Sequence, residues 1–360
     1  MKQAYDRSSR ERTGTLSPGV PVRTLVLGVM LLLLAFTIAV SPARANEPGR
    51  VTGGMKYTIP AWFKTSFLEL TDDAAEAAEA DRHLMLFMHL DECPYCEAVL
   101  NESIVNSDYS PWLRERFDAI AINIRGDREV AFNEEVTLSE KKLAELLKVW
   151  QTPVVIFLDG ENRQVTRIDG YRTPLEFERI LHYVDDKAYL QMDLPSYVAK
   201  VSAGPHYRFR DHPAFTDETA LSLNDKPLLV IFEDAWCGGC DLLHDTLLAD
   251  PGVNEQLANY RVVRLDAESE TPIVTPDGRQ STPRAWIREL GIDARPAILA
   301  FAEGRELVRI KGVLRNWHFT TAIRYVGEGH YKTYPTQRKF SRALRKQQLE
   351  AGIDVDLGRQ

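Results

Sequence analysis

The sequence predicts an α/β protein made of two domains with the same design. Its four cysteines form two Cys-x-x-Cys pairs, Cys93–Cys96 and Cys237–Cys240, and each pair follows an apolar run and precedes a helical pattern. The elements predicted around the first pair recur 144 positions later (237 − 93) around the second. A chain of 360 residues is also long enough for two hydrophobic cores.

The first unit is predicted to alternate strands and helices. Its elements in chain order are a leading helix over 71–82, a strand over 84–88, a helix after the cysteines, a strand over 119–124, a helix over 139–149, a strand from Pro153, a return strand toward Gly170 and a closing helix to Val184. The closing helix opens with Thr173-Pro174-Leu175-Glu176, a capping box with proline at the first helical position.

The second unit repeats this order. Its predicted elements are a short leading helix over 216–223, strands over 228–232 and 262–266, a helix over 283–290 capped by Thr282, a strand from Pro296, a return strand toward Gly312 and a closing helix capped by Asn316 that ends at Val326. The first cysteine and the strand-leading proline are 60 residues apart in one unit (153 − 93) and 59 in the other (296 − 237). This agreement indicates a duplication.

The predicted domain limits are 55–188 and 214–330, with a linker over 189–213 and a basic tail over 331–360. The linker combines prolines with aromatic residues, so it is expected to pack on one or both domains rather than act as a flexible spacer. The tail carries lysines and arginines with apolar residues between them. A solvated helix face is one interpretation of the tail, and contact with an anionic membrane surface or an acidic partner is the other.

Residues 1–45 have the pattern of a signal peptide. The apolar run 24–40 follows several basic residues and precedes Ala43-Arg44-Ala45, which predicts cleavage before Asn46. The run approaches the roughly 20 residues of a membrane helix, so an uncleaved anchor is the alternative. Both outcomes predict a periplasmic location, where disulfides persist. The remaining chain has 38 basic and 50 acidic residues, which gives no indication of nucleic-acid binding.

The cysteine pairs are candidate thiol-disulfide redox sites. A spacing of two lets both sulfurs reach one bond, and the amides and dipole of a helix N-terminus favour the thiolate of the first cysteine. Purely structural disulfides are the alternative.

Metal and haem sites fit the cysteines less well. A four-thiolate zinc site would need pairs 141 residues apart (237 − 96) to converge, whereas common zinc modules space their pairs by roughly 15–20 residues. Covalent haem needs a histidine after the second cysteine, where Glu97 and Asp241 stand. No metal or cofactor is therefore expected besides the two disulfides. The nearby histidines show no metal-ligand spacing and are expected at the surface or in loops; they are His83, His89 and His244.

The order of elements resembles the thioredoxin fold, and the resemblance covers both halves. It implies two thioredoxin-like domains, each with a central mixed β-sheet flanked by helices. In the first half, Cys-Pro-Tyr-Cys, the polar excursion 124–130 before a helical pattern, and Gln151-Thr152-Pro153-Val154 resemble the periplasmic thioredoxins of the sulfur-oxidation locus, the SoxW type. The second half is similar but more distant, through Trp236-Cys237 and Arg295-Pro296.

The chain departs from this family pattern in three ways. It is duplicated, and its second site has Gly-Gly between the cysteines, so the two sites are expected to differ in redox properties. Six residues before the first cysteine, where thioredoxin keeps a buried aspartate, stand Phe87 and Ile231. Nearby acids could substitute only from loop positions; these are Asp91, Glu92, Glu233 and Asp234.

The resemblance also implies roles for individual residues. The exposed attacking thiolates would be Cys93 and Cys237, and the resolving thiols Cys96 and Cys240. The substrate-binding residues would be Thr152, Pro153, Arg295, Pro296, Trp236 and Tyr95, with both prolines cis beside the sulfurs, where an extended segment can pair with the backbone. The charge of Arg295 would either lie near Cys237 or face water. Trp236 would either cover the sulfur or belong to the core.

Together these patterns predict a periplasmic thiol-disulfide oxidoreductase that acts as a protein-disulfide reductase on exported proteins. Recharging by a membrane electron donor is implied by the resemblance alone. Acidic residues flank both pairs and disfavour thiolates, which argues against a strongly oxidising protein. The alternatives are a disulfide oxidase or isomerase, and a client-binding, chaperone-like module with one vestigial site.

Overall fold

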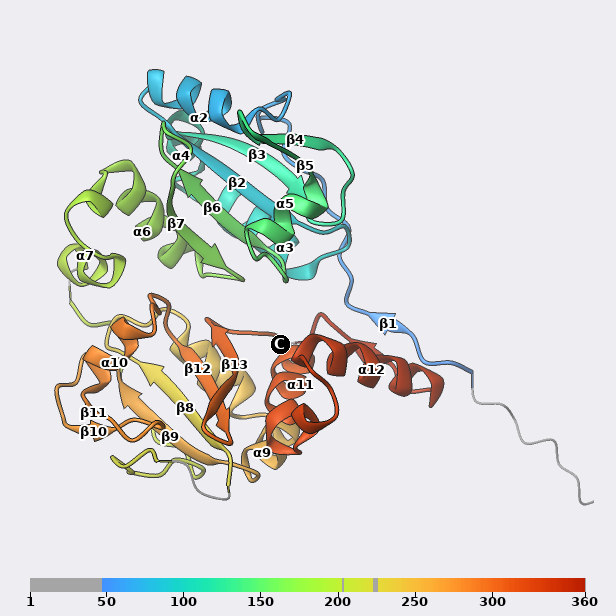
Figure 1. Ribbon diagram of the computed structural model, residues 1–360, viewed down its shortest axis with the longest axis vertical. Coiled ribbons are helices and arrows are strands. Elements are labelled where there is room, and N and C mark those ends of the chain that lie inside the picture. The colour runs from blue at the N-terminus through green and yellow to red at the C-terminus, as the bar shows by residue number, and fades with distance from the viewer. Residues whose placement is uncertain (1–46, 203, 223–225, 360) are drawn as a thin grey trace, which may run out of the picture. The chain divides into compact units, whose positions relative to one another are not determined.

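The computed structural model describes residues 47–202, 204–222 and 226–359. They contain two four-stranded sheets of equivalent topology, β3-β2-β6-β7 in the first half and β9-β8-β12-β13 in the second, and Figure 1 shows helices packed beside each sheet. Residues Pro48–Gln360 group into one compact unit. The predicted signal over 1–45 lies outside the described residues. No helix in the described part of the chain is long and apolar enough to cross a membrane.

The first sheet is mixed, as predicted. Its strands are β2 (His83–His89), β3 (Phe117–Asn123), β6 (Val154–Leu158) and β7 (Gln164–Asp169). Strand β2 runs parallel to β3 and antiparallel to β6, and β6 is antiparallel to β7. Every residue of β2 is buried because the two faces of the strand enter different cores. Met85 and Phe87 join one hydrophobic cluster, whereas Leu84, Leu86 and Met88 join the other.

Helices complete both cores of the first domain. They are α2 (Leu70–Glu79), α3 (Pro94–Ala98), α4 (Ser110–Arg116), α5 (Glu140–Leu146), α6 (Pro174–Asp185) and the π-helical segment Val99–Val105. The capping box before α6 is confirmed. The backbone N–H of Thr173 donates to the Glu176 carboxylate, and the backbone N–H of Glu176 donates to the Thr173 hydroxyl. The end of the polar excursion and the residues after it form a hairpin of β4 (Glu129–Asn133) and β5 (Val136–Ser139).

The second domain repeats this arrangement. Its strands are β8 (Leu228–Glu233), β9 (Arg261–Asp266), β12 (Ala297–Ala302), β13 (Arg305–Lys311) and the short β10 (Ile273–Val274) and β11 (Gln280–Ser281). Its helices are α8 (Cys240–Leu242), α9 (Pro251–Leu257), α10 (Pro283–Glu289), α11 (Asn316–Gly327) and the π-helical segment Leu243–Leu247. The two faces of β8 also enter different cores, with Leu229 and Ile231 in one and Val230 and Phe232 in the other.

Two local predictions for this domain are wrong. Residues 216–222 form no helix, because their backbone pairs with strands: Thr216 N–H donates to Val262 O at 2.8 Å and Leu221 N–H to Val274 O at 2.7 Å. Asn316 does not cap α11, since it is the first helical residue and Arg315 occupies the cap position without a side-chain bond. The cap by Thr282 before α10 is confirmed.

The described residues of the connecting segments pack against the domains. The short 3-10 turn Ala188–Leu190 crosses the start of the predicted linker. The linker also contains α7 (Leu194–Val201), and its Tyr197 and Tyr207 are buried. The predicted tail contains the 3-10 turn His330–Lys332 and α12 (Gln337–Glu350), with Phe340 packed in the second-domain core. Strand β1 (Val51–Thr52) pairs in parallel with β14 (Val355–Asp356). Membrane contact by the tail stays a prediction.

Candidate redox sites

Each cysteine pair lies just beyond the end of the buried strand of its domain and is disulfide-bonded. The Cα atoms are 5.2 Å apart for Cys93–Cys96 and 5.5 Å for Cys237–Cys240, within the range a disulfide can span. Cys93 caps α3, and its Sγ accepts the Cys96 N–H at 3.1 Å. The first sulfur of this pair therefore sits where helix amides favour a thiolate after reduction.

The prediction that the attacking sulfurs are exposed is wrong. Cys93 is 7% exposed and Cys237 is 2% exposed. Cys93 belongs to the first-domain core, whereas Cys237 and Cys240 form a small cluster with Tyr207. Only a small part of either residue is therefore open to solvent, and less of Cys237 than of Cys93.

The strand-leading prolines are both cis, as the resemblance implied. At the first site, the residue before the proline contacts the first cysteine of the pair, because Thr152 Oγ1 lies 3.3 Å from Cys93 Sγ. At the second site, the corresponding residue is Arg295, and its Nε forms an ion pair with Asp234 Oδ2 at 2.9 Å. The water-facing alternative for Arg295 is wrong, because the residue is 8% exposed.

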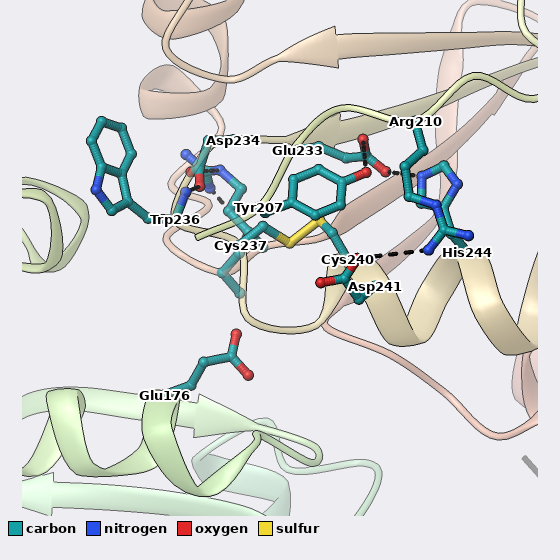
Figure 2. Close-up of a disulfide and its surroundings, with 12 residues drawn as sticks. Glu176, Tyr207, Arg210, Glu233, Asp234, Trp236, Cys237, Cys240, Asp241 and His244 are labelled. Atoms are coloured by element: carbon teal, nitrogen blue, oxygen red, sulfur yellow. Dashed lines mark hydrogen bonds and ion pairs between the residues drawn. A yellow bond between two sulfur atoms is a disulfide. The ribbon is translucent and has the colours of Figure 1, made fainter. Parts of the chain in front are cut away.

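Asp234 organises the loop before the second pair. Burial raises the pKa of its carboxyl, and the Arg295 guanidinium opposes that rise. Its Oδ1 also accepts the Trp236 N–H at 2.9 Å. This turn directs the indole of Trp236 away from the disulfide, as Figure 2 shows, so Trp236 does not cover the sulfur. Tyr207 takes that place. Whether Trp236 contacts substrate stays a prediction.

Neighbouring side chains approach both glycines of the second site closely. A Cβ atom on Gly238 would lie 2.6 Å from Glu176 Cδ, and one on Gly239 would lie 3.1 Å from Pro296 Cδ and Val313 Cγ2. Figure 2 shows the Glu176 carboxylate facing this loop. The Gly-Gly dipeptide therefore fits a close approach of other side chains and backbone to the cysteines.

The acids near the two pairs differ in their surroundings. Asp91 and Glu92 are exposed at the first site. Glu233 was expected in a loop, but it is the last residue of β8 and is fully buried. Its Oε2 accepts the Tyr207 hydroxyl at 3.0 Å, and its Oε1 lies 2.8 Å from His244 Nε2. The second domain therefore buries a carboxylate beside its disulfide, although Ile231 occupies the position that thioredoxin gives to aspartate.

The prediction that the three histidines lie at the surface is also wrong. His83, His89 and His244 are 4%, 8% and 6% exposed, because the first two belong to β2 and the third packs under Tyr207 and Glu233. No group of His, Cys, Asp or Glu in the described residues is placed to hold a metal ion.

His89 and Glu233 occupy equivalent positions, each four residues before the first cysteine. Each contacts a tyrosine that precedes the central strand of its sheet. Tyr57 Oη lies 2.9 Å from His89 Nδ1, and Tyr207 Oη lies 3.0 Å from Glu233 Oε2. Burial lowers the pKa of His89. Neither tyrosine belongs to a motif that the sequence reveals, although the 144-residue offset relates the two positions they contact.

Tyr95, between the cysteines of the first pair, packs against the start of α11. The Arg315 N–H donates to its hydroxyl, and the Arg315 guanidinium lies 5.2 Å from the ring centre. The His318 ring centre is 5.6 Å from that of Tyr95. Burial raises the pKa of Tyr95. Substrate contact by Tyr95 stays a prediction, and it would require this packing to open.

His318 should make the protein sensitive to acid. Burial, helped by Arg315 and Arg345, lowers the pKa of His318 to about 4, against about 6.5 in an unfolded chain. Between pH 6.5 and pH 4 the unfolded state therefore binds more protons than the folded state. The free energy of unfolding should fall by about 3 kcal/mol as pH falls through this range.

Urea unfolding at pH 7 and pH 4 measures this loss. His318→Phe should lose correspondingly less stability than the parent between these two pH values. The exposed-residue control His206→Gln should lose as much stability as the parent; an equal loss in His318→Phe would contradict the assignment.

Comparison with known families places both halves in one family. The thioredoxin-like domain model matches residues 70–185 and 216–327, which is more than half of the chain. The chain belongs to the thioredoxin-like family. Two thioredoxin-like domains, each with a Cys-x-x-Cys disulfide, make it a thiol-disulfide oxidoreductase.

Solved structures with similarity to this thioredoxin-like protein cover about one domain of it. A thioredoxin-fold protein from Helicobacter pylori is 18% identical over 37% of this chain and 95% of its own, with a TM-score of 0.30. A thioredoxin from Thermus thermophilus is 26% identical over 31% and 82%, with a TM-score of 0.25. The C-terminal domain of DsbD from Neisseria meningitidis, in its reduced form, is 17% identical over 28% and 82%, with a TM-score of 0.23. Comparison with curated proteins finds no match.

Proposed function

We propose that this thioredoxin-like protein is exported and reduces disulfide bonds in other exported proteins. The observation that carries the proposal is that each domain places a Cys-x-x-Cys disulfide beside a strand led by a cis proline. Two such sites in one chain support electron transfer to protein disulfides. Export is supported by the signal pattern over 1–45. Reduction of the two disulfides by a membrane electron donor rests on the resemblance to periplasmic thioredoxins.

The first site illustrates the exchange. In the reduced protein, the Cys93 thiolate attacks one sulfur of a substrate disulfide, forms a mixed disulfide and releases the other substrate sulfur as a thiolate, which takes up a proton. Cys96 then loses its proton and attacks Cys93 Sγ, which restores the Cys93–Cys96 bond and releases the second substrate thiolate. Two electrons have passed to the substrate, and the protein ends in the disulfide state of the structure. Cys237 and Cys240 would act in the same order.

The direction of electron flow is proposed from the charges near the sulfurs. A strongly oxidising site needs a stabilised thiolate, and neighbouring negative charge disfavours one. Solvent screens the exposed acids of the first site, so their effect is small. The charge of the buried Glu233 at the second site is screened less by solvent. Tyr207 contacts both this carboxylate and the disulfide. These surroundings support a reductase.

The test is the reduction potential of each pair measured alone. Cys93→Ser/Cys96→Ser leaves only the second pair, and Cys237→Ser/Cys240→Ser leaves only the first. Each variant is equilibrated in defined thiol buffers, and the thiol and disulfide forms are separated after alkylation. Potentials near −270 mV, the thioredoxin range, are expected for a reductase. Potentials near −120 mV would identify a disulfide oxidase and overturn the proposed direction.

A further inference from the structure

The second disulfide is covered by a residue from the predicted linker. Tyr207 is 3% exposed and shares one apolar cluster with Cys237 and Cys240, which are 2% and 0% exposed. Figure 2 shows its ring beside the disulfide, with its hydroxyl directed toward Glu233. Tyr207, the residue that covers this disulfide, therefore belongs to a segment that precedes the second domain in sequence. It is not part of the sheet or of the cysteine loop.

The hydroxyl of Tyr207 is held by buried partners. It donates to Glu233 Oε2 at 3.0 Å, and Glu233 Oε1 lies 2.8 Å from His244 Nε2. Both carboxylate oxygens of Glu233 therefore have a side-chain partner, Tyr207 on one and His244 on the other. Burial, followed by the Glu233 charge, raises the pKa of Tyr207, which keeps its hydroxyl protonated. Hydrogen bonds to a charged acceptor are stronger than neutral ones, so this arrangement fixes the ring.

The backbone of the same segment is tied to the cysteine loop. The N–H groups of His206 and Tyr207 both donate to Ala235 O, at 3.0 and 3.1 Å. Three residues after Tyr207, Arg210 forms an ion pair with Asp245 at 2.7 Å. That pair is exposed and contributes little by itself. The backbone bonds and the buried hydroxyl are therefore the main attachments that must open before the ring can leave.

We propose that Tyr207 is a latch that sets the rate at which thiols reach Cys237, an inference that rests on the proposed redox function of this site. Reduction begins when an incoming thiolate attacks Cys237 Sγ. A mixed disulfide forms, the Cys237–Cys240 bond breaks, and Cys240 leaves as a thiolate that takes up a proton. A second thiolate from the reductant then releases Cys237, and the reductant becomes a disulfide. The first attack needs access to a sulfur that Tyr207 covers.

The test uses the full chain with Cys93→Ser and Cys96→Ser, so that only the second disulfide reacts. Its reduction by dithiothreitol at pH 7 is followed by quenching with an alkylating agent and counting the modified cysteines. Tyr207→Ala removes the ring and should speed reduction at least tenfold. Tyr207→Phe keeps the ring but loses the bond to Glu233, and should speed it about threefold. The matched control Tyr197→Ala removes an equally buried tyrosine of the same linker and should leave the rate unchanged.

The outcomes separate the latch from the redox function. A Tyr207→Ala rate within twofold of the parent, or an equal acceleration in Tyr197→Ala, would overturn the latch and leave the redox function standing. If Tyr207→Ala does not fold, Tyr207→Phe decides, and a rate equal to that of the parent overturns the latch. A second disulfide that stays oxidised in every folded variant, even in excess dithiothreitol, would overturn the redox function of this site and the latch with it.

Discussion

Replacing Cys93 and Cys237 together by serine should abolish catalysed reduction of a protein disulfide. A serine oxygen can neither attack a disulfide at neutral pH nor form one, so neither domain could make the mixed disulfide. Each single variant should keep the activity of the other domain, because each domain holds a complete pair of its own. The measurement is insulin reduction with dithiothreitol as the electron source, in which the double variant should match the uncatalysed rate.

The control for these variants replaces exposed neighbours of the same pairs. Asp91→Ser and Asp241→Ser, each at an exposed position close in sequence to one pair, should stay close to the parent rate. A double cysteine variant that keeps its effect on a client protein would contradict a redox role and identify a client-binding module. A single variant that loses all activity would show that the two sites work in series rather than independently.

Arg295→Met should destabilise the second domain by about 3–5 kcal/mol at pH 7. The substitution leaves the carboxylate of Asp234 buried without its ion-pair partner, and both residues are less than a tenth exposed in the parent. Adding Asp234→Asn removes the charge as well, so the double variant should recover most of the loss. Urea unfolding with linear extrapolation measures these differences.

The effect of Arg295→Met should depend on pH. Burial already raises the pKa of Asp234, and removal of the guanidinium that opposes this rise would raise it further. The folded state then binds more protons than the unfolded state above the unfolded pKa, so the stability of the variant falls as pH rises. The loss should therefore be largest at pH 7 and smaller near pH 4. A loss that is the same at both values would show that packing, rather than the unpaired charge, causes the destabilisation.

The sequence predicted those parts of the fold that local patterns determine. The apolar run 84–88 lies within β2, and the Thr173–Glu176 capping box begins α6 as expected. The short helix predicted over 216–223 was wrong because residues 216–222 form backbone hydrogen bonds with β9 and β10, which lie far away in the sequence. No local helical pattern can report such pairing.

The sequence predicted the reactive residues of the candidate sites but not which residues bury them. The cysteines and cis prolines follow from spacing and resemblance, and both prolines are cis in the structure. The burial of Cys237 depends on Tyr207, which is 30 residues earlier in the chain (237 − 207) and belongs to the linker. Glu233 looked like a loop acid because charge at the end of an apolar run is usually solvated. Its burial follows from the partners that Tyr207 and His244 supply.

Trapping of mixed disulfides tests most directly whether both domains exchange thiols with protein disulfides. Cys96→Ser and Cys240→Ser remove the resolving cysteine of each pair, one variant at a time, with the other pair replaced by serines. Each reduced variant is mixed with a disulfide-containing protein, and adducts are identified by mass spectrometry. We expect covalent adducts at Cys93 and at Cys237, both released by dithiothreitol. A folded variant that forms no adduct at its remaining cysteine would show that the disulfide of that domain is structural.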